Sequence, residues 1–293
     1  MRVLATIAEL IGERPSWAGL HDVGLVPTMG FLHAGHLSLF RQARTENGVV
    51  VASIFVNPTQ FGPGEDLSRY PRDLPHDLER LEAAGVDVVF TPLAEEIYPR
   101  GFSTYVEPTG PLATRLEAAT RPGHFRGVAT VVLKLFQIVQ PHQAYFGQKD
   151  AQQVAVVRRM VADLNQQVAL RILPTIREAD GLAMSSRNSY LGPEDRKAAT
   201  VLYRALHAGY QMLDQAPLDG GNAVARAMAE IIAEEPRATL DYAEVCDPNT
   251  FEPLTKLRGV ALLAVAARVG PARLIDNFVR RPDGSWDTGV RLP

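Results

Sequence analysis

A chain of 293 residues is long enough for one large domain or two of ordinary size. Its 46% hydrophobic and 22% charged residues exclude a disordered or fibrous protein, and its net charge of −3 argues against a surface built to bind polyanions such as nucleic acid. The single cysteine, Cys246, permits no disulfide within the chain and favours a reducing compartment.

The N-terminal segment and the longest apolar runs predict neither export nor membrane insertion. Residues 1–15 carry Glu9 and Glu13 within an apolar stretch and lack a small-residue cleavage site, unlike a signal peptide. The apolar runs 49–56 and 260–269 are too short to span a bilayer. We therefore expect a soluble, cytoplasmic protein without a membrane partner.

Short β-branched runs alternate with helical patterns up to about residue 175. The run 48–56 is almost continuously apolar, which is typical of a strand buried on both faces of a parallel sheet. We expect strands at 23–27, 48–56, 86–90, 144–146 and 168–173, and helices at 35–47, 74–84, 127–140 and 150–165. This alternation predicts an α/β fold with a Rossmann-like, doubly wound parallel sheet.

The pattern changes after Pro174. Pro193, followed by two acidic residues, indicates a helix start, so we expect helices at 193–214 and 221–234. Three strands follow, at 239–247, 260–269 and 273–280, with little chain between them to cross over. The prediction is a first domain over 1–175 and a smaller α+β domain with an antiparallel sheet over 176–293.

The stretch Pro27–Leu39 places two glycines and two histidines between an expected strand and the next helix. Ligands bind beyond the carboxyl ends of strands in open α/β sheets. Gly35 and His36 fall in the first turn of the helix, where backbone N–H groups and the helix dipole favour anions. Glycine at positions 30 and 35 would let phosphate oxygens approach the backbone closely.

Gly30 and Gly35 are spaced as in a P-loop, but His36 and Leu37 stand where Lys and Ser or Thr should follow. The spacing of His33 and His36 lets both face one ligand. Imidazole donors suit attack at an α-phosphate, where negative charge builds on phosphorus. The alternatives are an ordinary structural role for the histidines and a His-x-x-His metal site, although helical zinc pairs are more often separated by four.

Two further loops follow expected strands in the same way. Asn57 and Gln60 come directly after the strand 48–56, and their amides can bind a hydroxyl or a carboxylate without adding charge. Turn chemistry in Asn-Pro is the alternative for Asn57. After the strand 144–146, Lys149 offers a compact charge for phosphate beside Asp150, with Gly147 before them and Gln153 one turn along the helix. A solvated ion pair is the alternative there.

A fourth loop, residues 180–189, packs two serines and an arginine together. Ser185, Ser186 and Arg187 can donate hydroxyl and guanidinium hydrogen bonds to a polyphosphate. An ordinary polar loop is the alternative. We predict that all four loops lie at one end of the same sheet and form one site.

The His-x-x-His turn and the downstream serine-rich basic loop resemble the "HIGH"-like and "KMSKS"-like motifs of the nucleotidylyltransferase superfamily. More narrowly, the chain is similar to the pantothenate synthetase (pantoate–β-alanine ligase) family. The similar stretches are VPTMGFLHAGHLSL, SIFVNPTQFGPGEDLSRYPRDL, HFRGVATVVLKLF, YFGQKDAQQ and READGLAMSSRNSYL, which occur in the family's order between residues 26 and 191.

The resemblance implies an AMP-forming carbon–nitrogen ligase of pantothenate and coenzyme A biosynthesis. ATP and (R)-pantoate would give pantoyl adenylate and pyrophosphate, and β-alanine would then displace AMP to form pantothenate. ATP is expected as a co-substrate, with Mg²⁺ arriving on its phosphates. The resemblance also implies a homodimer, an ATP- and pantoate-binding domain over 1–175, and a domain over 176–293 that acts as a lid or completes the ATP site.

The resemblance assigns roles residue by residue. The expected catalytic residues are His33 and His36, which stabilise the α-phosphate, and Lys149, which bridges pantoate and that phosphate; His36 matches the family's proton donor. Gln60 is expected to contact pantoate and β-alanine, Gln153 to contact pantoate, and Asn57 and Tyr70 to line the same pocket. Asp77 falls in the family's acidic stretch, but His76 stands where some members have another carboxylate, so Asp77 is not assigned as a metal ligand. The expected ATP contacts are Met29, Gly30, Phe31, Leu32, His33, Ala34, Gly35, His36, Gly147, Gln148, Lys149, Asp150, Ile176, Met184, Ser185, Ser186 and Arg187.

Two other functions remain as alternatives. A plain adenylyltransferase would release pyrophosphate but keep AMP on its product. A nucleotide-sensing module without catalysis would bind ATP but would not exchange pyrophosphate with ATP in the presence of pantoate.

Overall fold

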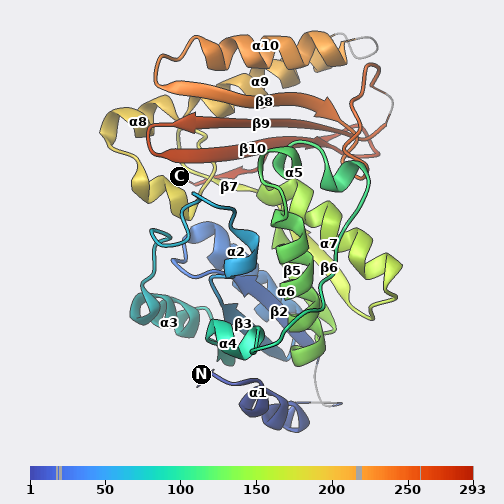
Figure 1. The fold of residues 1–293 in the computed structure, drawn as a ribbon. Coiled ribbons are helices and arrows are strands. Elements are labelled where there is room, and N and C mark those ends of the chain that lie inside the picture. Colours follow the sequence, from blue (N-terminus) through green and yellow to red (C-terminus); the bar gives the residue numbers. More distant parts are fainter. Residues whose placement is uncertain (18, 20–21, 216–219, 258, 293) are drawn as a thin grey trace. The chain divides into compact units, whose positions relative to one another are not determined.

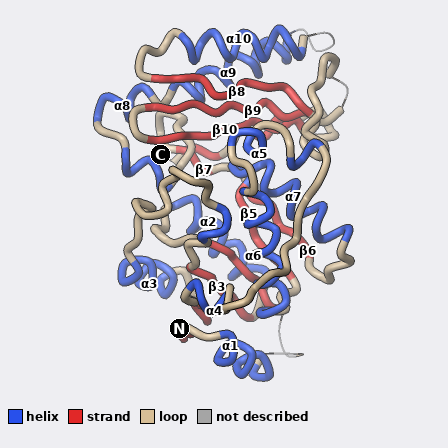
Figure 2. Tube along the Cα trace, in the orientation of Figure 1, coloured by secondary structure: helices blue, strands red, loops and turns tan. Residues whose placement is uncertain are grey.

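The computed structural model describes residues 1–17, 19, 22–215, 220–257 and 259–292. The chain divides into two compact units, Met1–Gly147 with Val156–Leu173, and Gln148–Ala155 with Pro174–Pro293. The placement of a functional domain boundary at residue 175 stays a prediction. Figures 1 and 2 show the elements of each unit.

The first unit is built on a six-stranded sheet whose strands all run parallel. Its strands are β1 (Arg2–Leu4), β2 (Val23–Thr28), β3 (Val49–Ile54), β4 (Val88–Phe90), β5 (Gln143–Gly147) and β6 (Ala169–Leu173). The helices are α1 (Ile7–Glu13), α2 (Ala34–Glu46), α3 (Leu74–Ala83), α4 (Ala94–Ile97), α5 (Glu117–Thr120), α6 (His124–Val139) and α7 (Ala151–Asp163), whose first residues belong to the second unit. The 3₁₀ turns are η1 (Arg14–Ser16), η2 (Pro58–Gln60) and η3 (Pro111–Ala113).

The strand order β1-β4-β3-β2-β5-β6 makes the sheet doubly wound. From β2 the chain adds β3 and β4 on one side, and later β5 and β6 on the other. The order therefore reverses between β2 and β5, and open α/β sheets bind ligands at such a switch point, beyond the carboxyl ends of the strands. The predicted α/β class and its doubly wound parallel sheet are confirmed.

The two helices α2 and α3 cover one face of this sheet. Their apolar residues Leu39, Phe40, Ala43 and Leu81 pack with Val26, Val50, Ala52 and Val89, alternate residues of β2, β3 and β4. Helix α6 also packs on β2, and most of its side chains are buried. This packing fixes the strand ends from which the loops of the site emerge.

The second unit holds a four-stranded antiparallel sheet in the order β11-β10-β9-β8. The strands are β8 (Ala238–Cys246), β9 (Ala261–Val269), β10 (Ala272–Arg280) and β11 (Trp286–Asp287). Helices α9 (Val201–Gln215) and α10 (Gly221–Ala233) bury their apolar faces on it, and α8 (Pro193–Ala198) precedes them (Figure 1). A two-stranded parallel pair, β7 (Ile176–Arg177) and β12 (Val290–Arg291), and the turns η4 (Gln148–Asp150) and η5 (Ser186–Tyr190) complete the unit.

One expectation from the sequence is corrected, and four short strands were not predicted. The helix expected over 193–214 is divided into α8 and α9 at Ala199–Thr200, where the chain has neither Pro nor Gly to indicate a break. Strand β1 was not predicted, because its three residues are largely exposed at the sheet edge and carry no alternating pattern. The two-residue strands β7, β11 and β12 are also too short for a periodicity signal.

Candidate active site

The loop after β2 is held by the carboxylate of Asp77, in the first turn of α3. Its Oδ2 accepts the Phe31 N–H and its Oδ1 the Leu32 N–H, each at 2.7 Å. Both N–H groups point at one carboxylate because Gly30 and Phe31 have φ angles of 80° and 51°. A Cβ on Gly30 would lie 2.9 Å from Oδ2. Because Gly30 has no side chain, the Asp77 carboxylate can lie close to the backbone at this position.

Asp77 is 2% exposed, and both its oxygens are engaged by backbone groups. Burial raises the pKa of this carboxyl, against the lowering effect of the two N–H hydrogen bonds. Arg80 donates to the carbonyl of Leu32, so the same helix holds both sides of the loop. Asp77 thus shapes the loop. In the part of the chain that the structure describes, no three His, Cys, Asp or Glu side chains gather as a metal site would require.

The two histidines cap the N-terminus of α2. Nδ1 of His33, the N-cap residue, accepts the Gly35 N–H at 3.2 Å, and Nδ1 of His36 accepts the His33 N–H at 3.3 Å. Their ring centroids are 4.0 Å apart. A ring nitrogen that accepts a hydrogen bond carries no proton, so this pattern assigns the proton of each neutral ring to Nε2. The Gly35 N–H, which the sequence analysis left open for an anion, is bonded to the His33 ring.

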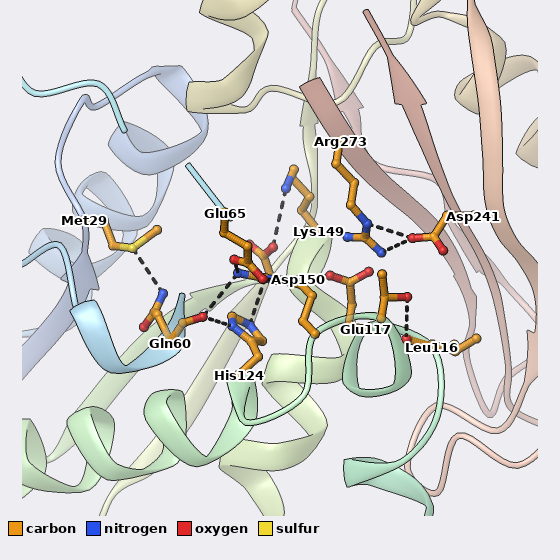
Figure 3. Close-up of polar contacts among 12 residues, drawn as sticks. Met29, Gln60, Glu65, Leu116, Glu117, His124, Lys149, Asp150, Asp241 and Arg273 are labelled. Carbon is orange, nitrogen blue, oxygen red and sulfur yellow. Dashed lines mark hydrogen bonds and ion pairs between the residues drawn. The ribbon is translucent and has the colours of Figure 1, made fainter. Parts of the chain in front are cut away.

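Gln60 joins the loop after β3 to the loop after β2 (Figure 3). Its Nε2 donates to Sδ of Met29 at 3.1 Å, while its Oε1 accepts from Nδ2 of Asn57 at 3.0 Å. These two contacts determine which terminal atom of the Gln60 amide is the nitrogen donor and which is the oxygen acceptor. The loops after β2 and β3 are therefore in contact.

Asn57 uses its hydrogen-bonding capacity inside the protein and is 1% exposed. Its Nδ2 also donates to the Gly127 carbonyl at 3.1 Å. Its Oδ1 accepts from the Thr59 N–H, the Thr59 hydroxyl and the Tyr98 hydroxyl. The contacts of Asn57 therefore orient Gln60 and hold η2 against α6.

A buried histidine and an ion pair support the backbone of Gln60 (Figure 3). Because a carbonyl only accepts, His124 Nδ1 donates to the Gln60 carbonyl at 2.8 Å, and Nε2 then accepts from Arg121 at 3.2 Å. Burial, together with the charge of Arg121, lowers the pKa of His124 to about 4. Arg121 forms a bidentate pair with Glu65, at 2.9 and 2.6 Å. Burial opposes ionisation of Glu65, but this pairing outweighs it and lowers the pKa of the carboxyl.

In the second unit, Lys149 lies in η4 immediately before α7. Its Nζ is 3.4 Å from Oδ1 of Asp150, and the two side chains are 20% and 47% exposed (Figure 3). An ion pair of this length with one exposed partner is weak. The Lys149 ammonium group can therefore still bind another anion. Gln153 is half-buried one turn further along, in α7.

The turn over residues 177–183 brings two predicted ATP contacts together. The Met184 N–H donates to the Ile176 carbonyl at 2.9 Å, and Arg177 and Ala183 form an isolated antiparallel β-bridge. Ser185 then caps η5 by accepting the Arg187 N–H at 3.3 Å. The segment Met184–Arg187 is thus adjacent to Ile176 within this unit.

The predicted site residues are divided between the two units. The first unit brings together Met29–His36, Asn57 and Gln60, with Gly147 at the end of β5 and Tyr70 packed edge-on to Phe61. The second unit holds Gln148–Asp150, Gln153, Ile176 and Met184–Arg187. Their binding roles, and the prediction that all four loops form one site, stay predictions.

Arg121 and His124 were not predicted as site residues. The family-like stretch HFRGVATVVLKLF begins at His124, but it gives neither residue a role. Their partners, Glu65 and the Gln60 carbonyl, lie about 60 positions earlier in the chain. Among the helices described, none has the length and apolar character needed to cross a membrane.

Comparison with known proteins finds relatives along almost the whole chain. A family described as pantoate–β-alanine ligase matches residues 2–279. Pantothenate synthetase of Herpetosiphon aurantiacus is 58% identical over 281 residues, covering 95% of this chain and 100% of that protein. The enzyme of Roseiflexus castenholzii is 57% identical over 279 residues, covering 95% and 99%.

Solved structures give the same result. Pantothenate synthetase from Thermus thermophilus superposes with a TM-score of 0.90 at 53% identity, covering 94% of this chain and 98% of that one. Pantoate–β-alanine ligase from Francisella tularensis, solved in complex with beta-gamma ATP and β-alanine, gives 0.77 at 37% identity, covering 94% and 97%. Sequence and fold together place this chain in the pantoate–β-alanine ligase family.

Proposed function

We propose that the chain activates (R)-pantoate with ATP and transfers the pantoyl group to β-alanine. In the first step a pantoate carboxylate oxygen attacks the α-phosphorus of ATP, and pyrophosphate leaves. In the second step the amine of β-alanine attacks the acyl carbon of pantoyl adenylate, loses a proton and displaces AMP. The products are pantothenate, AMP and pyrophosphate.

The residue roles are supported by one observation, made at the switch point of the sheet. Two imidazoles cap helix α2 there, on the same loop whose Met29 contacts Gln60. With Nδ1 of each ring occupied, His33 and His36 present their donors on Nε2. Donors aimed where negative charge develops, at the α-phosphate, stabilise the transition state more than the ground state. We assign both histidines that role, and Gln60 the binding of pantoate and β-alanine through its oriented amide.

In the proposed reaction, the cationic side chains come from the second unit. Lys149 offers a compact charge that binds the pantoate carboxylate and the phosphate under attack, and it counters their mutual repulsion. We assign Ser185, Ser186 and Arg187 to the phosphates of ATP, together with Gln148, Asp150, Ile176 and Met184 as further ATP contacts and Gln153 as a pantoate contact.

Mg²⁺ is proposed to arrive with ATP and to neutralise phosphate oxygens. Asp77 does not suit direct ligation, because both its oxygens already accept backbone N–H groups. We further propose a homodimer in the cytoplasm. The family resemblance supports the dimer, and the lone buried Cys246 supports a reducing compartment.

One incubation tests the reaction. The protein is mixed with ATP, Mg²⁺, pantoate and β-alanine, and the products are identified by mass. The expected result is pantothenate and AMP, with free AMP dependent on β-alanine. Exchange of labelled pyrophosphate into ATP should require pantoate alone. A product that retains AMP would indicate an adenylyltransferase, and the absence of exchange would indicate a non-catalytic nucleotide-binding protein.

A further inference from the structure

A single buried side chain on β10 holds the backbone around Lys149. Asn277 is 4% exposed, and its Nδ2 donates to the Lys149 carbonyl at 2.8 Å and to the Gln148 carbonyl at 3.1 Å. Its Oδ1 lies 3.3 Å from Nε2 of Gln148, which donates to it. Both N–H groups and the carbonyl oxygen of one amide are thus directed at η4.

Asn277 is itself anchored by the opposite face of the sheet. Asp276 occupies the row that faces the core, where its carboxylate accepts the Asn277 N–H at 2.7 Å. The same carboxylate binds Arg177 in a bidentate pair, at 2.6 and 2.9 Å, and both side chains are almost fully buried. The guanidinium carbon lies 5.1 Å from the ring centroids of Tyr203 and Phe278. Asn277 therefore projects from a rigid base.

We propose that Asn277 is a positioning residue for Lys149. Its two hydrogen bonds fix successive peptide planes of η4, and so fix the point from which the lysine side chain extends. A compact charge stabilises a reacting phosphate only when its distance is held, and a displacement of about 1 Å can lower a rate about 100-fold. The inference rests on the proposed role of Lys149 in pantoate activation.

The kinetic test is a double-mutant cycle. Asn277→Asp keeps the volume but turns carboxylate oxygens toward two carbonyl oxygens. We expect it to lower pantoate-dependent exchange of pyrophosphate into ATP by about 10- to 100-fold. In a Lys149→Ala background the same change should lower the residual rate by less than about twofold, because the residue through which it acts is gone. Asn249→Asp, the same charge change at an exposed site of this unit, should have no effect.

A second readout does not depend on catalysis. The folded protein without substrates is treated with sulfosuccinimidyl acetate, and acetylation of Lys149 is compared with that of the exposed Lys197. Asn277→Asp and Asn277→Ala should both raise the ratio, because loosening η4 exposes an amine that is now 20% exposed. An unchanged ratio, or equal kinetic losses with and without Lys149, would overturn the proposal. If Lys149→Ala alone retained full pyrophosphate exchange, the proposed role of Lys149 would be wrong. The acetylation ratio would still test whether Asn277 positions Lys149.

Discussion

The two histidines at the start of α2 serve the helix and the proposed chemistry at once. Each uses Nδ1 to cap the helix and presents its proton on Nε2. A substitution at His36 therefore removes a cap and a donor together, and the two losses must be separated. Glutamate separates them, because Glu at the third helical position is a normal partner in a capping box but its carboxylate has no proton to donate.

We predict that His36→Ala lowers the rate of pantoyl-adenylate formation about 100-fold or more, which corresponds to about 3 kcal/mol for one aimed donor. Loss of the cap should add a modest decrease in stability, of about 1 kcal/mol. His36→Glu should recover the stability but not the rate. Pyrophosphate exchange and thermal unfolding measure the two effects. An active His36→Glu enzyme would contradict the role of His36 as a donor.

Asp77 gives a second prediction at this scale. Asn at this position keeps one acceptor but turns an NH₂ group toward a backbone N–H, either that of Phe31 or that of Leu32. A buried unpaired donor costs about 1–3 kcal/mol, and the loop with its left-handed Phe31 should lose its shape. We expect Asp77→Asn to raise the KM for ATP.

The matching measurement is the dependence of the Asp77→Asn enzyme on Mg²⁺. A carboxylate that shapes the loop predicts a raised KM for ATP at every Mg²⁺ concentration. Recovery of the normal KM at high Mg²⁺ would instead indicate that Asp77 binds the metal. The exposed Asp283 offers a control substitution by Asn, which should change neither quantity.

At the scale of the element, the contact between α6 and η2 positions Gln60. Gly127 lies where the two backbones meet, and a Cβ there would lie 2.4 Å from the Thr59 carbonyl oxygen and 2.7 Å from the Gln60 nitrogen. No flexible side chain is available to move aside, so the 3₁₀ turn itself must shift. The Asn57 hydrogen bond to the Gly127 carbonyl would shift with it.

Gly127→Ala should therefore destabilise the protein by about 1–3 kcal/mol and raise the KM for pantoate, because Gln60 is displaced. Denaturation and steady-state kinetics measure the two effects. Gly12→Ala in α1, where a Cβ meets nothing within 4 Å, is the matched control and should be neutral or slightly stabilising. A normal KM for pantoate in Gly127→Ala would contradict the assignment of Gln60.

Elements with strong local signals were predictable, and those that depend on distant partners were not. The apolar run 48–56 and the helix that ends before Pro141 were predicted to within a few residues, because burial and proline act locally. The break at Ala199–Thr200 has no local signal. In the site, Gly30 was predicted as special, but the reason, a carboxylate from α3, lies about 46 positions away in the chain. Sequence patterns identified the loops, whereas the hydrogen-bond partners required the fold.

At the scale of the whole molecule, acid stability is linked to His124. The pKa of this buried ring is about 4, against 6.5 for an exposed one, so between these values the unfolded chain binds more protons than the folded one. The free energy of unfolding must therefore fall as the pH falls from about 6.5, and this contribution levels off below about 4. For a shift of this size the loss between pH 7 and pH 5 is about 2 kcal/mol. Glu65, whose pKa is lowered, adds a loss of the same sign at still lower pH.

Denaturation at pH 7 and pH 5 tests this linkage, with His124→Gln as the decisive variant. Glutamine can donate to the Gln60 carbonyl and accept from Arg121, as the neutral ring does, but it does not titrate in this range. The variant should lose about 2 kcal/mol less than the wild type on acidification, whereas His76→Gln, at a half-exposed position, should behave as the wild type. In the folded protein His124 takes up its proton only near pH 4, and this places two cations side by side behind Gln60. Binding of pantoate should therefore weaken as the pH approaches 4 in the wild type, and not in His124→Gln. Parallel acid losses in both proteins would mean that other groups control acid stability.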